Sequence, residues 1–157
     1  MMSVNLIEWS SRISQAEKTR QGIAPLTEQI DSLSLKDAYS IQLEQIHSKV
    51  NAGDAITGKK IGLTSLAMQQ LLNVDEPDYG HLLESMAITN NVLDCSECIK
   101  PRVEAEIAFV MKEDLIGPNV TLEQVLAATD YVVASLEIVD SRIKDWKIKL
   151  LDTIADN

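Results

Sequence analysis

The sequence has no apolar run long enough to cross a membrane, because no window approaches the roughly 20 apolar residues that a transmembrane helix needs. Its N-terminus, Met-Met-Ser-Val-Asn-Leu-Ile-Glu-Trp, also lacks the basic flank and apolar core of a secretory signal peptide. These two absences predict a cytoplasmic protein.

Positive charge is scarce as well, with 14 Lys and Arg against 24 Asp and Glu and a net charge of −10. Nucleic acids and anionic membrane surfaces would repel so acidic a chain, which argues against both as partners. An anionic metabolite still fits if a divalent cation mediates its binding.

Cysteine occurs only at Cys95 and Cys98, in the motif Cys-Ser-Glu-Cys. A zinc site is not predicted, because there is no second Cys pair and neither His47 nor His81 stands at ligand spacing. The pair also does not follow a strand and open a helix, as a thioredoxin-type motif requires. We interpret it as two ordinary thiols in a turn.

The chain of 157 residues, 45% of them apolar, is long enough for one domain with a real core. Residues 1–54 read as two amphipathic helices. Leu6, Trp9, Ile13 and Ala16 form the apolar stripe of the first, and Gly22 is expected to close its C-terminus. A capping box at Ser34 opens the second, which ends near residues 51–53. Both stripes are interpreted as packing faces without a catalytic cluster.

Residues 55–157 read as a β core behind these helices, which makes the predicted fold class α+β. The stretch 55–65 is a predicted strand on which Lys59 and Lys60 take opposite faces, so that one lysine points inward as a candidate acid-base group. Ser65 is expected to cap a short helix through Leu72. The composition of 75–80, Asp-Glu-Pro-Asp-Tyr-Gly, predicts a turn.

The stretch Pro101–Met111 alternates with a two-residue period, which predicts a strand with Glu104 and Glu106 on one face. An isolated pair of this kind usually faces water. A second predicted strand, residues 130–139, carries Glu137 in an apolar run, where a carboxylate needs a partner or a metal. If the strands are neighbours, the three glutamates converge, and three oxygen ligands suit Mg²⁺ or Mn²⁺ rather than zinc.

Several motifs in order resemble the 2-keto-4-pentenoate hydratase (2-hydroxypenta-2,4-dienoate hydratase) family of the fumarylacetoacetate hydrolase superfamily. The residues that carry the resemblance are Gly58–Ser65, Pro77–Gly80, Pro101–Phe109, Glu137–Arg142, Asp145–Lys149 and Asp152–Asn157. The resemblance implies an incomplete front part of a β-roll or barrel. It also implies that Glu104, Glu106 and Glu137 hold the divalent ion.

In the same family, the residues matching Lys60 and Asp78 line the site, with Lys60 expected to transfer protons and Asp78 to orient or deprotonate water. Thr64 and Ser65 are the expected substrate-binding residues. We expect Lys60, not Lys59, to face the glutamates. The implied reaction adds water to 2-hydroxypenta-2,4-dienoate, giving 4-hydroxy-2-oxopentanoate, in the meta-cleavage degradation of aromatic compounds.

Two alternatives stay open: the related 2-oxo-3-hexenedioate (4-oxalocrotonate) decarboxylase, and a truncated non-catalytic subunit or binding module. The substrate is expected to be a small 2-oxo or 2-hydroxy-dienoic acid. The expected partners are further copies of the chain, in a homo-oligomer, and an aldolase, dehydrogenase or decarboxylase of the same pathway. Family members continue well past Asn157. We therefore expect this chain to be an N-terminal part of the fold, oligomeric or marginally stable, with little hydratase activity by itself.

Overall fold

A computed structural model describes residues 4–157 and confirms the α+β class, with two separate two-stranded sheets. The chain divides into two compact units. The helical unit comprises Met1–Lys100 and Ser141–Asn157, and the ribbon unit comprises Pro101–Asp140. The predicted boundary at residue 54 separates a helical region from a β core, whereas these units are distinguished by their compactness. The predicted boundary therefore stays a prediction. No helix among the described residues is both long and apolar enough to span a membrane.

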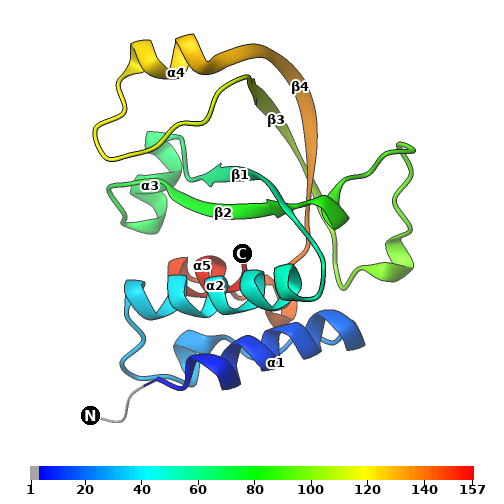
Figure 1. Ribbon diagram of the computed structural model, residues 1–157. Helices are drawn as coiled ribbons and strands as arrows, with labels where there is room; N and C mark the ends of the chain where they lie inside the picture. Colours follow the sequence, from blue (N-terminus) through cyan, green and yellow to red (C-terminus); the bar gives the residue numbers. More distant parts are fainter. Residues whose placement is uncertain (1–3) are drawn as a thin grey trace. The chain divides into compact units, whose positions relative to one another are not determined.

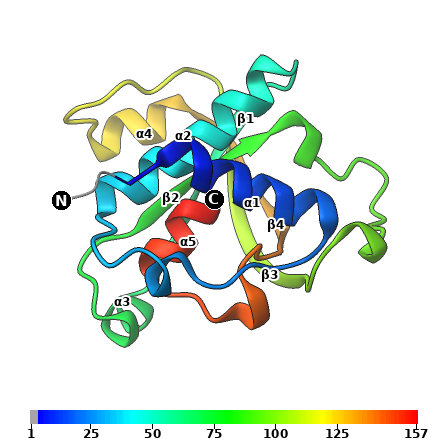
Figure 2. The ribbon, with the colours of Figure 1, turned by 90° about the horizontal axis from the view of Figure 1, so that it is seen from below.

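Two long helices form the base of the helical unit. Helix α1 (Leu6–Thr19) is capped by the Asn5 side chain, and α2 (Leu35–Asn51) begins at the predicted capping box between Ser34 and Asp37. Figure 1 shows α1 as the outer layer, α2 and α5 (Leu150–Asp156) as the next, and a β-hairpin beyond them. In the view from below, α1 lies in front (Figure 2).

The core of this unit joins α1, α2 and α5, and it confirms the stripe predicted for the first helix as a packing face, through Trp9 and Ile13. The stripe predicted for the second helix is wrong in part, because Leu35, Leu43 and Val50, which the apolar pattern placed on it, are exposed. Helix α2 packs instead through Ala38 and Ile41.

The fully buried members of the core include Ile13, Leu26, Ile41, Ile143 and Ile154. Removing such side chains from water is the main stabilising contribution, at roughly 1.5–3 kcal/mol for each. The core therefore holds the two ends of the chain together, because its members come from both.

The prediction for Gly22 is wrong. Helix α1 ends at Thr19, and Arg20 takes the left-handed conformation that closes it, with φ 56°. Gly22 instead allows close backbone approach, since a Cβ there would lie 2.9 Å from the Cα of Lys144. This contact accompanies a parallel bridge between Ile23 and Ile143.

The hairpin pairs β1 (Ile56–Gly62) with β2 (Asp78–Leu83) in antiparallel register, and α3 (Leu66–Leu72) lies between them in sequence. The turn predicted over 75–80 is therefore wrong from Asp78 onward, because pairing with β1 draws Asp78 and Gly80 into a strand. Tyr79 of β2 stacks on Tyr39 of α2 with ring centroids 4.5 Å apart, which fixes one face of the hairpin on the helices.

Short 3₁₀ turns connect these elements: Leu26–Glu28, Glu84–Met86, Cys95–Glu97 and Lys144–Trp146. Cys95 and Cys98 are thiols at the third of these turns, and the backbone N–H of Cys98 donates to Cys95 O at 3.2 Å. The interpretation of Cys-Ser-Glu-Cys as two thiols in a turn is confirmed.

The ribbon unit is a long antiparallel pair, β3 (Arg102–Met111) and β4 (Thr129–Val139), joined through α4 (Leu122–Ala128). A capping box at Thr121 opens α4, with Gln124 as its reciprocal partner. One face of the ribbon presents exposed apolar side chains, among them Val103, Ile107 and Leu136. The alternating pattern of the sequence thus matches an amphipathic ribbon.

Candidate metal centre and acid-base residues

Three carboxylates meet on the polar face of the β3–β4 ribbon. Glu104 and Glu137 are direct partners in the ladder, and Glu106 follows two residues along β3. Directly opposite residues share a face, as do residues two apart, so the register alone places all three side chains together. This arrangement follows the sequence-based expectation.

The three side chains also converge at their tips, since one oxygen of each lies within 4.8 Å of the others. Glu104 and Glu106 are exposed, whereas Glu137 is half-buried. Three like charges at such distances repel one another unless a cation compensates. The cluster therefore has the composition and spacing of a site for a hard divalent ion, and metal binding there stays a prediction.

Lys60 and Asp78 lie together on one face of the β1–β2 hairpin in the helical unit. Lys60 stands opposite Gly80 and Asp78 stands opposite Gly62 in the ladder. Both residues are half-buried. The structure thus groups the predicted acid-base residues with each other, and it groups the glutamates separately within the ribbon unit.

Lys59 occupies the other face of the hairpin, opposite His81. Burial lowers the pKa of the Lys59 amino group. The pKa of His81 is lowered as well, first by burial and then by the neighbouring Lys59 and His47. The two lysines take opposite faces, as predicted. That Lys60 faces the three glutamates stays a prediction.

The two predicted substrate-binding residues follow β1 directly. The Ser65 hydroxyl accepts a hydrogen bond from Met68 N at 3.2 Å and caps α3, as predicted. Its own proton is still available for donation, because this contact uses only an oxygen lone pair. Thr64 is exposed beside it. Substrate binding by the pair stays a prediction.

Two polar residues that support the hairpin were missed at the sequence level. Gln42 is fully buried; its Nε2 donates to Tyr79 O and Ile154 O, and its Oε1 accepts from His81 Nδ1 at 3.0 Å in the corresponding tautomer. The Asn157 side chain bonds both the backbone N and the backbone O of His81. The only sequence signal was a glutamine inside an apolar helical stripe.

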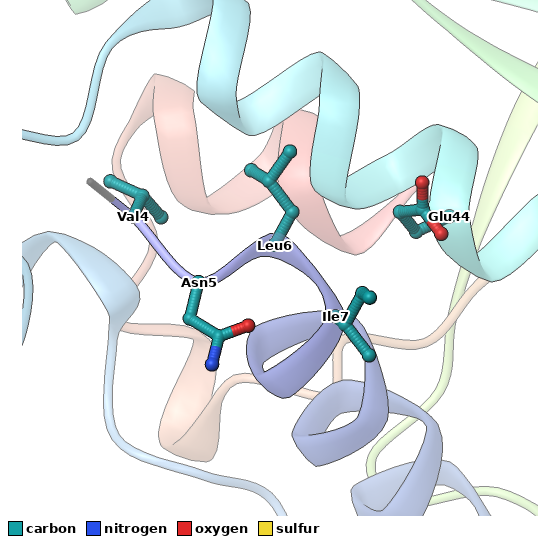
Figure 3. A pocket seen from close by; sticks show the side chains of 5 residues that line it. All are labelled: Val4, Asn5, Leu6, Ile7 and Glu44. Atoms are coloured by element: carbon teal, nitrogen blue, oxygen red, sulfur yellow. The ribbon is translucent and has the colours of Figure 1, made fainter.

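A hollow of about 540 Å³ in the helical unit lies where α1 begins and is lined by Val4, Asn5, Leu6, Ile7 and Glu44 (Figure 3). Its lining offers one carboxylate and no cation or nucleophile. A second hollow nearby is lined mainly by serines of α1 with Glu44 and Ser48 of α2. Neither lining contains the acid-base pair, so neither is our candidate reaction site.

No family model matches the chain. Individual proteins do: a 2-hydroxypent-2,4-dienoate hydratase of Pseudomonas putida is 46% identical over 152 residues, which cover 96% of this chain and 68% of that protein. The chain belongs to the 2-keto-4-pentenoate hydratase family. A 2-hydroxyhexa-2,4-dienoate hydratase of Comamonas testosteroni is also 46% identical, over 149 residues that cover 93% of this chain. The match covers 56% of the Comamonas protein, so the chain spans between half and about two thirds of these relatives.

A solved structure of the family is also similar over the whole chain. The 4-oxalocrotonate decarboxylase from Pseudomonas putida G7, complexed with magnesium and adipate, superposes with a TM-score of 0.93 at 35% identity. This chain is covered completely and 60% of that chain is covered. The same enzyme complexed with calcium and acetate gives a TM-score of 0.91.

Proposed function

We propose that this protein takes part in the divalent-metal-dependent addition of water to 2-hydroxypenta-2,4-dienoate, giving 4-hydroxy-2-oxopentanoate. The observation that carries the proposal is the convergence of Glu104, Glu106 and Glu137 on one face of the ribbon. Family membership selects the reaction, since two relatives at 46% identity are named as hydratases of 2-hydroxydienoates.

The carboxylate cluster fits a divalent ion by its donor chemistry. Mg²⁺ takes oxygen ligands at about 2.0–2.1 Å and Ca²⁺ at about 2.3–2.6 Å, so two oxygens on one ion stand up to roughly 4–5 Å apart. The mutual separation within 4.8 Å is close to that range, and exposed glutamates adjust it by side-chain rotation. Mg²⁺ is our first choice and Mn²⁺, which accepts the same ligands, the second.

A bound ion would supply Lewis-acid chemistry toward the substrate carboxylate and its C2 oxygen. The protein groups then have separate tasks. Lys60 moves the proton released from the 2-hydroxyl to carbon 5, which leaves a C3–C4 double bond conjugated with the new carbonyl. Asp78 orients a water molecule and takes its proton as the water oxygen adds at carbon 4. Delivery of the proton taken from the water to carbon 3 completes the product. Thr64 and Ser65 are proposed to bind the substrate.

The experiment is a turnover assay of the purified protein on the enzymatically generated dienol, with Mg²⁺, with Mn²⁺ and with EDTA. The proposal expects 4-hydroxy-2-oxopentanoate only when a divalent ion is present. A folded protein that gives no product with either ion would support a non-catalytic subunit or binding module instead. Product formed equally well in EDTA would contradict the metal-dependent mechanism.

The second candidate function is decarboxylation of 2-oxo-3-hexenedioate. It is favoured by the TM-score of 0.93 with a structure named as a 4-oxalocrotonate decarboxylase. The higher identity to hydratases, 46% against 35%, favours hydration. Release of CO₂ from the dicarboxylic substrate, without hydration of the dienol, would reverse this order.

We further propose that the two ladders belong to a larger β-roll and that the protein works as a homo-oligomer. Exposed Val103, Ile107 and Leu136 support this, because apolar faces of this kind promote association. A pathway aldolase, dehydrogenase or decarboxylase is the proposed functional partner. The mass of the protein in solution tests the homo-oligomer, and a monomeric mass at assay concentration would contradict it.

A further inference from the structure

Two glycines stand directly opposite the proposed acid-base residues in the hairpin. Lys60 of β1 faces Gly80 of β2, and Asp78 of β2 faces Gly62 of β1. All four positions lie on one face of the ladder, because opposite residues and residues two apart share a face. Each charged side chain thus has an opposite partner without a side chain. Strands β1 and β2 run side by side in Figure 1.

The side chains of Lys60 and Asp78 occupy the space that these glycines leave. A Cβ on Gly80 would lie 2.8 Å from Cε and 3.1 Å from Cγ of Lys60, and 2.9 Å from Oδ1 of Asn157. A Cβ on Gly62 would lie 3.2 Å from Cγ of Asp78 and closer still to its Oδ1. Separations below 3.0 Å are essentially absent for real Cβ atoms, so Lys60 and Asp78 lie across the opposite strand where only glycine permits it.

Backbone conformation does not require glycine at either position. Among glycines, the left-handed φ occurs at Gly53, whereas Gly62 and Gly80 keep backbone angles that other residues adopt. Glycine inside a strand also weakens it, since it has no side chain to pack and loses more entropy on folding. The feature that these two positions provide is therefore space: at Gly62 for Asp78, and at Gly80 for Lys60 and the amide oxygen of Asn157.

The backbone around Gly80 is held from both sides. The carbonyl of Tyr79 accepts from Gln42 Nε2 at 3.2 Å, while His81 N donates to Asn157 Oδ1 at 2.7 Å and His81 O accepts from Asn157 Nδ2 at 3.0 Å. Gly80 itself is buried. Lys60 accordingly lies over a backbone segment whose position is fixed by α2 and by the end of the chain.

We propose that Gly62 and Gly80 are positioning residues that lay Lys60 and Asp78 across the hairpin as a preorganised acid-base pair. Their effect on turnover rests on the function proposed above, whereas their effect on the two side chains does not. Preorganisation of this kind matters because a misplacement of about 1 Å in reacting groups costs on the order of 10²-fold in rate. Glycine at these two positions therefore lowers the stability of the strands and lets Lys60 and Asp78 lie across the hairpin.

The first test compares Gly80→Ala with the matched control Gly58→Ala. Gly58 lies on β1, on the same face as Lys60 and two residues before it, but a Cβ there would meet Leu82 Cδ1 at 3.5 Å, an ordinary contact. We expect Gly80→Ala to lower kcat by about 10²-fold with little change in KM, and Gly58→Ala to leave kcat unchanged. The Lys60 resonance in ¹³C-dimethyl-lysine spectra, assigned with Lys60→Arg, should change its chemical shift only in Gly80→Ala.

The spectra separate the two proposals, because they need no turnover. A moved Lys60 resonance in a protein without hydratase activity would leave the positioning inference standing and remove the proposed function. An unmoved resonance and unchanged kcat in folded Gly80→Ala would overturn the inference.

A second test covers the case in which Gly80→Ala does not fold. The three atoms nearest to a Cβ on Gly62 would all belong to Asp78. Gly62→Ala should therefore lower the melting temperature when Asp78 is present and should lose that effect in an Asp78→Ala background. An equal loss of melting temperature in both backgrounds would show that Gly62 serves the strand and not Asp78, which contradicts the inference.

Discussion

Glu104 and Glu137 stand directly opposite each other in the β3–β4 ladder, with Glu106 next on the same face. Like charges in this relationship destabilise a ladder, by up to about 1 kcal/mol for a direct pair. A fold that keeps such a pair on one face gives up stability there unless a cation binds. The glutamates that would bind a cation therefore lower the stability of the fold when no cation is bound.

The first prediction concerns the effect of these like charges on stability, with and without Mg²⁺. In EDTA, Glu104→Gln should raise the free energy of unfolding by about 0.2–1 kcal/mol, because it removes the like-charge pair. Excess Mg²⁺ should stabilise the wild type and not the variant. Urea unfolding in both buffers measures this, with Glu113→Gln, an exposed carboxylate just after β3, as the control. A Glu104→Gln protein less stable than wild type in EDTA would contradict the interpretation.

The second prediction separates the two lysines of β1. Lys60→Met should lower turnover of the dienol by about 10²–10⁴-fold, the usual contribution of a general acid-base group, and leave divalent-ion affinity largely intact. Lys59→Met is the matched control on the opposite face of the strand. Initial rates with Mg²⁺ and an ion-binding titration on each variant measure the two effects. An equal loss from Lys59→Met would reverse the assignment.

The third prediction is a loss of stability in mild acid through His81. Burial, followed by the charges of Lys59 and His47, lowers the pKa of His81 in the folded protein. A lowered pKa means that the unfolded chain takes up the proton more readily. The contribution of His81 to stability is then complete above about pH 6.5, the unfolded value, and is lost as the pH falls from there through the folded pKa.

Melting temperatures recorded between about pH 5 and 8 test this. His81→Asn should flatten the decline below about pH 6.5, whereas His47→Gln, at the exposed second histidine, should retain it. If His81→Asn and wild type decline in parallel, the buried imidazole is not the cause.

The fourth prediction concerns the buried carboxylate of Asp152, which is fully buried in the helical unit. It accepts from Thr27 N at 3.0 Å, Thr27 Oγ1 at 2.7 Å and Lys149 N at 3.0 Å, and so connects α5 to the segment after α1. Asp152→Asn turns an amide N–H₂ toward these donors and should lower the free energy of unfolding by about 3 kcal/mol.

Denaturant unfolding of Asp152→Asn should be compared with that of Asp145→Asn. Asp145 is exposed and has a left-handed φ of 59°, a conformation that Asn tolerates. The control should change little. Similar losses in both variants would mean that the buried hydrogen bonds of Asp152 do not matter to stability.

Local patterns in the sequence predicted the parts of the fold that local interactions determine. The capping box at Ser34 opens α2, and the alternation around Glu104 gives the correct face of β3. The convergence with Glu137 was also predicted, because a carboxylate in an apolar strand needs a partner or a metal, and the neighbouring strand carries the other two glutamates. These inferences depend on residues that are close in sequence or on one pairing.

Features set by distant partners could not be predicted in this way. Strand β2 was missed because 75–80 has the composition of a turn, whereas its strand conformation comes from pairing with β1. The role of Gln42 depends on contacts with His81 and with Ile154, which is 112 positions away in the chain. Gly22 looked like a helix terminator, and only the backbone of Lys144 shows why a side chain does not fit there.

The most direct test of the account is a Mn²⁺ titration followed by electron spin resonance, on the wild type and on Glu106→Gln. Binding of this ion needs no substrate and no turnover, so it tests the carboxylate centre alone. We predict a single tight site per chain in the wild type, displaced by Mg²⁺ and lost in Glu106→Gln. Equal Mn²⁺ binding by the two proteins would show that the three glutamates of the ribbon are not the metal centre.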